Sequence, residues 1–524
     1  MLQIAIEQVW SLIFKGVEKM SIIELNLLTD EHWWSGTTAL GYTMPYGHGS
    51  SCTVDQIHNT SNNQVSPVLM SDHGRFLYAP EGLTYSFDNG KLSVSGDDIN
   101  YKTLEGGIKS CFEYLKTDIF PDDGEFPDED LIIHPQYNTW IELTHYQCEE
   151  KIIKYAENLV KNDMPRGVIM IDATWQEDYG VWDFHPGRFK NPKGMIDYLH
   201  KLGFKVMLWT APFVSPDSLT YMQLSKNGLL VKSANGEDAV RRWWDGYSAV
   251  LDLTNKESQV WFKQQLDRLQ KDYGVDGFKF DAGDPEFYRH DDITAKPITP
   301  NGQCEIYGMF GANYPLNEYR ACFGLAGKPL VQRLADKEHS WGVSGMASLI
   351  PNSLAQSLGG YRFICPDMIG GGEYRSFIEG AELDEELFVR YAQCSALMPM
   401  MQFSADPFRV LSKINAELCR EAAWLHEENG KYILSLIKKC VKDKSPVIAP
   451  VGFYDSEADI SKKDMFMLSD ELLVAPVIEK GVKKKELYLP HGDWLAWNGD
   501  KYKGGKRISV KVTMQDLPFF KKIK

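Results

Sequence analysis

The chain has 524 residues, 43% of them hydrophobic and 24% charged, with a formal net charge of −16. This length exceeds what one hydrophobic core organises, so we expect two or three domains, and the composition excludes disordered and fibrous classes. The acidic balance, with no cationic run before the KKK at 483–485, argues against nucleic acid and against an anionic membrane surface as partners.

The nine cysteines and the N-terminal residues bear on where in the cell the protein is expected to be located. The cysteine count is odd and no C-x-x-C pair occurs, so a disulfide framework or a zinc site is not expected. Residues 1–20 are apolar in places, but they contain Glu7, Lys15 and Glu18 and lack a basic start and a small-residue cleavage site. We therefore predict no signal peptide, no membrane span and a cytoplasmic location.

The first part of the chain reads as short antiparallel strands. Alternating stretches such as GRFLYA (74–79) and GKLSVSG (90–96) are separated by turn signals such as DNGK (88–91). The sequence predicts a β-sandwich-like N-terminal domain over residues 1–130.

From residue 131 to 444, apolar strand segments alternate with helical patterns. Strands are predicted to begin near 137, 167, 205, 277, 329, 362 and 398, and helices over 148–162, 193–202, 314–324, 348–358, 384–396 and 413–442. About eight such units favour a (β/α)8 TIM barrel over a doubly wound sheet, and no G-x-G-x-x-G follows a strand. Over 445–524 the strand character returns, which predicts a small C-terminal β-domain. The fold class is thus α/β.

Polar residues follow the predicted barrel strands, where the active site of such a barrel lies. They are Asp172, Trp175, Trp209, Asp281, Asp284, Arg333, Asp336, Asp367, Ser404 and Asp406, with Trp243, Trp244 and Asp245 in the loop-rich segment before 277. No H-x-H or H-x-x-x-H spacing accompanies them, so a metal hydrolase and a Ser-His-Asp hydrolase are poorly supported.

Several carboxylates with tryptophan walls suit glycoside hydrolysis, which needs one ionised and one protonated carboxyl group. Like charges raise one another's pKa, so two acids in one pocket can divide these roles, and Arg333 could keep one of them ionised. A single strand-end aspartate is more often a helix cap, and Trp244 could equally pack in a core. The joint occurrence favours catalysis.

Four segments carry a resemblance to a known family. GFKFDAGDPEF (277–287), SWGVSGMASLIPNSL (340–354), FICPDMIGGG (363–372) and MPMMQFSADPF (398–408) resemble the catalytic barrel of glycoside hydrolase family 31. The run DMFMLSDELLVAPVIEKG with ELYLPHGDWLAW (464–497) resembles the family's C-terminal segment. The resemblance covers roughly residues 135–520. Within the family, the motifs KFDAG (279–283) and PDMIGG (366–371) of this chain are most similar to those of the branch that contains the myogenesis-regulating glycosidase and bacterial α-galactosidases.

The resemblance implies a retaining α-glycosidase with two catalytic aspartates. Asp281 matches the nucleophile. The family's W-x-G-D-N segment, which carries the acid/base, is absent, and Asp336 is the best remaining acid, with Glu338 and Asp367 as competitors. Asp367 matches a family turn whose aspartate contacts a sugar hydroxyl or supports the pocket.

Two departures favour galactose as the sugar. The motif DAGE that is usual in this branch is DAGD here, so that Asp284 stands where the branch has a glutamate. The stretch around the last strand, MQFSADPF, also lacks the histidine that the α-glucosidases have near that strand. We expect an exo-acting α-galactosidase acting on an α-linked oligosaccharide or glycoside, without metal or cofactor; a homo-oligomer is compatible with the sequence. The expected substrate-binding residues are Asp172, Trp209, Trp244, Lys279, Arg333, Asp367 and Ser404. Alternatives are an α-glucosidase, an α-xylosidase or a catalytically silent carbohydrate-binding relative; a metal-dependent barrel hydrolase is disfavoured.

Overall fold

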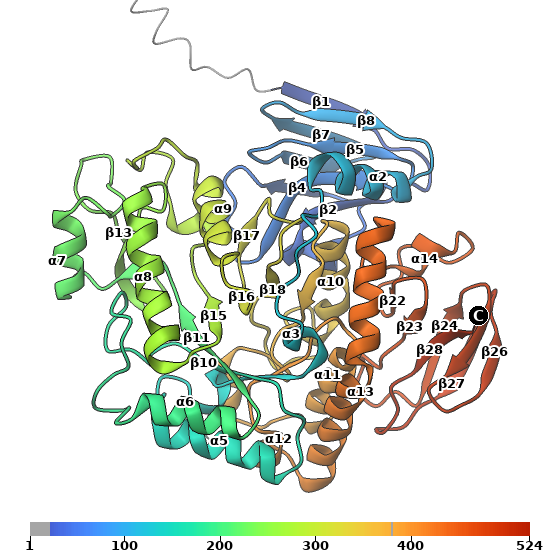
Figure 1. Cartoon of the computed structure of the whole chain (residues 1–524). Coiled ribbons are helices and arrows are strands. Elements are labelled where there is room, and N and C mark those ends of the chain that lie inside the picture. The colour runs from blue at the N-terminus through green and yellow to red at the C-terminus, as the bar shows by residue number, and fades with distance from the viewer. Residues whose placement is uncertain (1–20, 379–380, 524) are drawn as a thin grey trace, which may run out of the picture.

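The computed structural model describes residues 21–378 and 381–523, in which a β-rich N-terminal region, a barrel and a C-terminal β-region follow one another (Figure 1). The predicted absence of a signal peptide concerns residues 1–20, which lie outside the described residues. Within residues 21–378 and 381–523, no helix is both long and apolar enough to cross a membrane. All nine cysteines are free thiols.

Two sheets form the N-terminal region, which confirms its predicted β character. The first has the order β1-β7-β6-β3 and the second β17-β4-β5-β8, with β2 added on β4 and β17 (Cys322–Phe323) coming from later in the chain. Their bounds are β1 Ser21–Asn26, β2 Trp33–Thr37, β3 Cys52–Asp55, β4 Gln64–Ser71, β5 Arg75–Tyr78, β6 Thr84–Asp88, β7 Lys91–Gly96 and β8 Asn100–Thr103. At the predicted β6–β7 turn, Asn89 and Gly90 adopt positive φ angles of 47° and 74°, as a two-residue hairpin of this kind requires.

Eight parallel strands form the predicted barrel, in the order β19-β18-β16-β15-β11-β10-β9-β20. They are β9 Gln136–Asn138, β10 Val168–Ile171, β11 Lys205–Thr210, β15 Gly277–Phe280, β16 Asn317–Tyr319, β18 Val331–Arg333, β19 Phe363–Cys365 and β20 Gln402–Phe403. Between β19 and β20, the Ile369 N–H donates to the Gln402 carbonyl at 2.8 Å. The hydrogen bonding therefore continues from one end of the strand series to the other.

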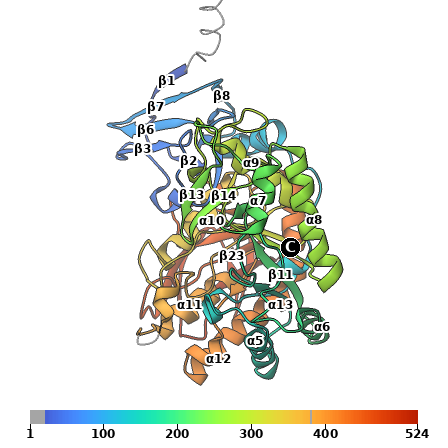
Figure 2. The same cartoon turned by 90° about the vertical axis from the view of Figure 1, so that its left-hand side faces the viewer.

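Helices surround the barrel (Figures 1 and 2). They include α5 Glu149–Lys161, α6 Pro192–Lys201, α8 Lys256–Tyr273, α9 Pro300–Gly311, α10 Leu349–Leu358, α11 Glu385–Ala396 and α13 Lys413–Asp443. Helix α8 shows how sequence sets a boundary, since the Asn255 side chain caps its start and Gly274, at φ 83°, ends it in the left-handed conformation. The chain then enters β15 and carries Asp281 to the strand's carboxyl end.

The helix predicted over 314–324 is wrong. That segment contains β16 and the two-residue strand β17 (Cys322–Phe323), and the helix lies earlier, as α9. The three residues of β16 include Asn317 and Glu318, which are fully buried, so the strand has no apolar signal. Their polar groups are satisfied by hydrogen bonds and an ion pair inside the barrel, which makes their burial tolerable.

The C-terminal region forms a six-stranded sheet, β21-β22-β23-β28-β25-β26, and a two-stranded sheet, β24-β27. The strands are β21 Ile448–Ala449, β22 Phe466–Leu468, β23 Leu472–Val474, β24 Lys484–Leu489, β25 Asp493–Ala496, β26 Lys501–Lys503, β27 Lys506–Lys511 and β28 Phe519–Ile523. One hydrophobic cluster joins residues of this region, such as Trp494, to Trp33 of the N-terminal sheets, with Leu358 of α10 among them. Both β-regions thus share a core beside the barrel.

Candidate active site

Asp281 follows β15, and two N–H donors fix its carboxylate. The Trp209 indole N–H, from β11, donates to its Oδ2 at 2.9 Å, and the Ala282 backbone N–H donates to Oδ1 at 3.0 Å. Ala282 has a positive φ of 55°, a conformation uncommon for a residue with a Cβ. The strained backbone directly after the carboxylate is typical of a functional position.

Arg320, which follows β16, joins two carboxylates. Its Nε lies 3.4 Å from Asp281 Oδ1, and its Nη2 donates to Asp284 Oδ2 at 2.7 Å. Burial would raise the pKa of Asp281, but Arg320, Lys279 and Arg333 together with the Trp209 hydrogen bond lower that pKa to about 2. Asp281 is therefore an ionised carboxylate at any pH near neutral. The pKa of Asp284, by contrast, is raised by its burial.

Arg333, at the end of β18, is the centre of a second network. Its Nη1 lies 2.8 Å from Asp336 Oδ1 and 2.7 Å from Asp367 Oδ1, and its Nε lies 3.2 Å from Glu318 Oε1. The two aspartates differ in environment, since the side chain of Asp336 is 42% exposed and that of Asp367 is buried. Burial raises the pKa of Asp367 to about 7, although Arg333 acts in the opposite direction.

Arg320 also links the two networks. Against its own burial, the charges of Asp284, Asp281 and Asp336 raise the pKa of the Arg320 guanidinium. Asp281 pairs with Arg320 as a buried carboxylate, whereas Asp336 pairs with Arg333 at a solvent-accessible position.

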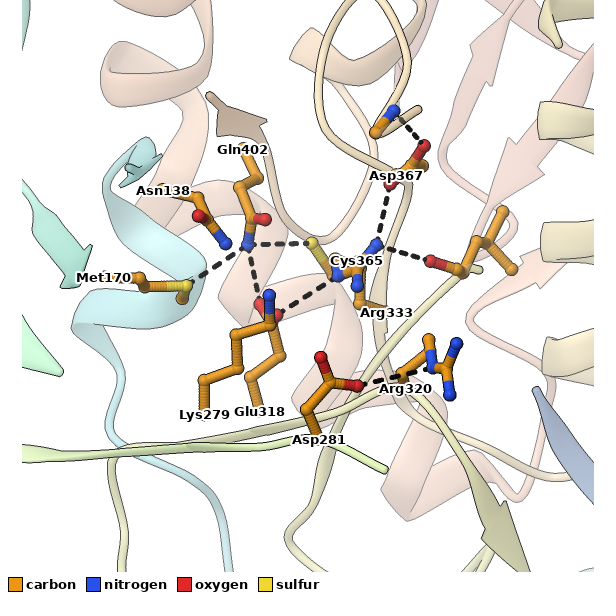
Figure 3. A network of polar contacts seen from close by, with 12 residues as sticks. Asn138, Met170, Lys279, Asp281, Glu318, Arg320, Arg333, Cys365, Asp367 and Gln402 are labelled. Carbon is orange, nitrogen blue, oxygen red and sulfur yellow. Dashed lines mark hydrogen bonds and ion pairs between the residues drawn. The ribbon is translucent and has the colours of Figure 1, made fainter. Parts of the chain in front are cut away.

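A buried polar network completes the barrel interior, and Figure 3 shows Lys279, Glu318 and Gln402 within it. Lys279 Nζ donates to Asp172 Oδ2 at 2.6 Å, and the Gln402 side-chain amide donates to Glu318 Oε2 at 2.6 Å. Burial would lower the pKa of Lys279, but Asp172 raises it above its usual value, so the lysine remains charged. At the carboxyl ends of the strands, the barrel interior is thus filled by hydrogen-bonded polar side chains and not by hydrophobic ones.

The remaining predicted residues lie in different settings. Trp244, in the loop between β13 (Val240–Trp243) and β14 (Gly246–Val250), is 48% exposed, and the Arg320 guanidinium lies 4.7 Å from its ring centroid. Ser404 is buried, and its hydroxyl accepts the Ile141 N–H at 2.7 Å. Asp406 caps the short helix α12 (Pro407–Val410), as the helix-cap alternative predicts for a strand-end aspartate.

Sequence reasoning does not identify Glu318 and Arg320, because the sequence predicts a helix over the segment that carries them. It also missed Asn63 and Gln64 of the N-terminal region, whose side chains contact the barrel strands described above. Among residues 21–378 and 381–523, no group of three or more His, Cys, Asp or Glu side chains is arranged to hold a metal ion.

Comparison with known families agrees with this geometry. The model of the glycosyl hydrolases family 31 TIM-barrel domain matches residues 136–422, more than half of the chain. The chain belongs to glycosyl hydrolase family 31. The family's C-terminal domain model matches residues 444–523, so the predicted family and barrel are both confirmed.

Relatives with curated names lie in several branches of the family. The chain is 30% identical to the myogenesis-regulating glycosidase of Mus musculus over 420 residues, which is 78% of this chain and 59% of that protein. It is 24% identical to alpha-glucosidase 2 of Bacillus thermoamyloliquefaciens over 94% of this chain and 66% of that one. The chain therefore spans about three fifths to two thirds of the length of these relatives.

Solved structures share the fold at low sequence identity. A GH31 dextranase of Flavobacterium johnsoniae complexed with glucose superposes with a TM-score of 0.81 at 20% identity, covering 97% of this chain and 67% of that one. A GH31 alpha-xylosidase from a soil metagenome, complexed with xylose, gives 0.83 at 18% identity, covering 97% and 80%.

Proposed function

We propose that this chain is a retaining exo-α-glycosidase and that its preferred sugar is α-linked galactose. The observation that carries the proposal is the unlike pair of carboxyl groups at the strand ends. Asp281 is buried and held ionised by Arg320, while Asp336 is accessible and lies on the neighbouring cation Arg333. A nucleophile needs the first environment, and a group that exchanges protons with an aglycone and with water needs the second.

In the proposed mechanism, an Asp281 carboxylate oxygen attacks the anomeric carbon while Asp336 donates its proton to the departing glycosidic oxygen. The products are a glycosyl ester on Asp281 and a free alcohol. Asp336, now a carboxylate, takes a proton from water, whose oxygen attacks the anomeric carbon and releases Asp281. A structural neighbour supports this course, since a cycloalternan-degrading enzyme from Trueperella pyogenes, with a TM-score of 0.80 at 19% identity, was solved in complex with a covalent intermediate.

Hydroxyl recognition is proposed for the groups around Asp281. The charged pair Asp172–Lys279 and the Arg333–Asp367 pair offer donors and acceptors in the barrel mouth, with Trp209 beside the nucleophile. The half-exposed ring of Trp244 is the candidate for stacking on a sugar face. For Ser404, whose hydroxyl already accepts a backbone N–H, we propose only that it supports the pocket wall.

The choice of galactose rests on the resemblance of KFDAG and PDMIGG and on the last strand, which carries no histidine. The relatives named alpha-glucosidase and the neighbour named alpha-xylosidase favour the alternative sugars glucose and xylose. Epimers differ by one or two hydrogen bonds, so turnover must decide among them.

The test is hydrolysis of p-nitrophenyl α-galactoside, α-glucoside, α-xyloside and N-acetyl-α-galactosaminide by wild type and Asp281→Ala. Asp406→Asn is the matched control, since Asp406 also follows a barrel strand but caps a helix. We expect one preferred sugar, activity abolished in Asp281→Ala, and activity kept in Asp406→Asn. Sugar binding without turnover of any glycoside would favour the silent carbohydrate-binding relative instead.

A further inference from the structure

We infer that Asn63 and Gln64, in the N-terminal region, are positioning residues for the two strands that carry Arg320, Arg333 and Asp336. This inference rests on the proposed function for its catalytic consequence. Its structural part, the fixing of the strand ends from outside the barrel, stands on the contacts alone.

The contacts converge on two backbone carbonyls. The Gln64 side-chain amide donates to the Arg320 carbonyl at 2.6 Å and to the Arg333 carbonyl at 3.1 Å. The Asn63 amide donates to the same two carbonyls, at 2.9 and 3.1 Å. Both side chains are buried, so water does not replace them as a partner. Two residues adjacent in sequence thus hold the ends of β16 and β18 together.

Asn63 makes one further contact, which bears directly on the proposed acid/base. Its Oδ1 accepts the Ala335 backbone N–H at 3.0 Å, one residue before Asp336. One amide group therefore fixes the backbone on both sides of Leu334, from the carbonyl of Arg333 to the N–H of Ala335. The Asp336 side chain is half exposed and has Arg333 as its ion-pair partner, so this backbone anchor determines where its carboxyl group lies.

The surrounding structure shows that these contacts belong to a continuous seam. The short strand β17, which follows β16, pairs in parallel with β4, in the register Cys322↔Gln64 and Phe323↔Val65. Gln356 of α10 donates to Gln64 Oε1 at 2.9 Å and to the Gln332 carbonyl at 3.0 Å, and so orients the Gln64 amide. The N-terminal sheet therefore includes β17, a strand from the barrel segment of the chain that begins two residues after Arg320.

The chemical consequence is specific to proton transfer. A general acid acts only within hydrogen-bond reach of the departing oxygen, and a displacement of about 1 Å can cost about 100-fold in rate. Substrates whose leaving group needs no proton, such as an α-glycosyl fluoride, depend on Asp281 but not on the acid. Displacement of the Asp336 segment should therefore separate the two substrate types.

The experiment compares Asn63→Leu and Gln64→Met, which keep volume and remove the amide, with Ser66→Ala as matched control. Ser66 is buried on the same strand, and its hydroxyl donates to a different barrel carbonyl, that of Gly359, at 2.6 Å. For Asn63→Leu we expect kcat/KM on an unactivated disaccharide to fall about 100-fold and that on the glycosyl fluoride to fall less than about fivefold. Ser66→Ala should change both by the same factor.

Hydrogen exchange gives a second readout that does not depend on turnover. In Asn63→Leu the amide of Ala335 should exchange faster than in wild type, and in Ser66→Ala it should not. Equal losses on both substrates, or unchanged exchange at Ala335, would overturn the inference even in an active enzyme. A wild type that cleaves neither substrate would refute the proposed function, and the exchange data would still decide the role of Asn63. If Asn63→Leu does not fold, Gln64→Met is judged by the same criteria, with exchange over residues 331–338.

Discussion

Replacing Arg320 with methionine should move the pH at which the nucleophile becomes ionised. The guanidinium Nε lies 3.4 Å from Asp281 Oδ1, and it is the first of the charges that hold the pKa of Asp281 at about 2. In Arg320→Met the burial remains while this cation is lost, so the pKa should rise from about 2 toward the ordinary aspartate value near 3.9, with Lys279 and Arg333 still acting to lower it. A full return to that value would be a shift of roughly two units, which corresponds to about 2.7 kcal/mol of lost stabilisation of the carboxylate.

The assay is kcat/KM on the preferred p-nitrophenyl glycoside from pH 3 to pH 8, because this ratio reports groups of the free enzyme. Wild type should show no loss of activity assignable to Asp281 within this range, whereas Arg320→Met should lose activity at the acid end of the range, as the pKa of Asp281 moves toward about 4. Arg320→Lys keeps the charge and should stay close to wild type. Samples held at each pH and assayed again at pH 6 exclude denaturation.

A second variant guards against a different explanation. Arg320→Met leaves Asp284 buried without its ion-pair partner, which is itself destabilising. Combining Arg320→Met with Asp284→Asn removes that unpaired charge. The acid limb of the pH profile, the fall of kcat/KM at low pH, should still lie at higher pH than in wild type. An acid limb that does not move in Arg320→Met, or that moves equally in Arg320→Lys, would refute the claim that this guanidinium sets the ionisation of Asp281.

Three further predictions concern the second network. Asp336→Ala should lose about 100-fold or more on unactivated glycosides and regain activity with azide as nucleophile, and unchanged turnover on every substrate would contradict its role. The pKa of Asp367 is raised to about 7, so the folded state holds a proton that the unfolded state releases near pH 4. Wild type should therefore lose thermal stability relative to Asp367→Asn as the pH rises from about 4 to 7, and a difference independent of pH would contradict this. Glu318→Leu removes one carboxylate from the buried Arg333, at a cost of about 3–5 kcal/mol, so its melting temperature should fall further than that of Glu318→Gln.

Part of the barrel could be predicted because strands such as β10, β15 and β19 are mainly apolar runs that lead to an acid. Asp172, Asp281 and Asp367 all follow such runs, and the structure gives each of them a cation as ion-pair partner, Lys279, Arg320 and Arg333 respectively. β16 could not be predicted in this way, since its interior-facing Glu318 is stabilised by Arg333 and Gln402 and not by apolar packing. A carboxylate buried by tertiary ion pairs gives no hydrophobic period to read.

The contribution of the N-terminal region lay beyond sequence reasoning for a related reason. Asn63 and Gln64 stand in a polar stretch that is typical of a loop, and their partners lie about 260 to 270 residues later in the chain. Asp284, by contrast, stands out in the sequence as a departure from the branch's DAGE, and the structure gives it a partner in Arg320 at 2.7 Å. The sequence motif is enough to single out Asp284, but its partner Arg320 is recognised only from the folded structure.

The most direct test of the central claim is to trap the proposed glycosyl ester. Wild type is incubated with a 5-fluoro-α-galactosyl fluoride, which slows the second step, and the digested protein is analysed by mass spectrometry. We expect one added glycosyl group on the peptide containing residues 277–287, located on Asp281, and none in Asp281→Ala. A label on Asp284 or Asp336, or turnover of α-galactosides by Asp281→Ala at the wild-type rate, would contradict it.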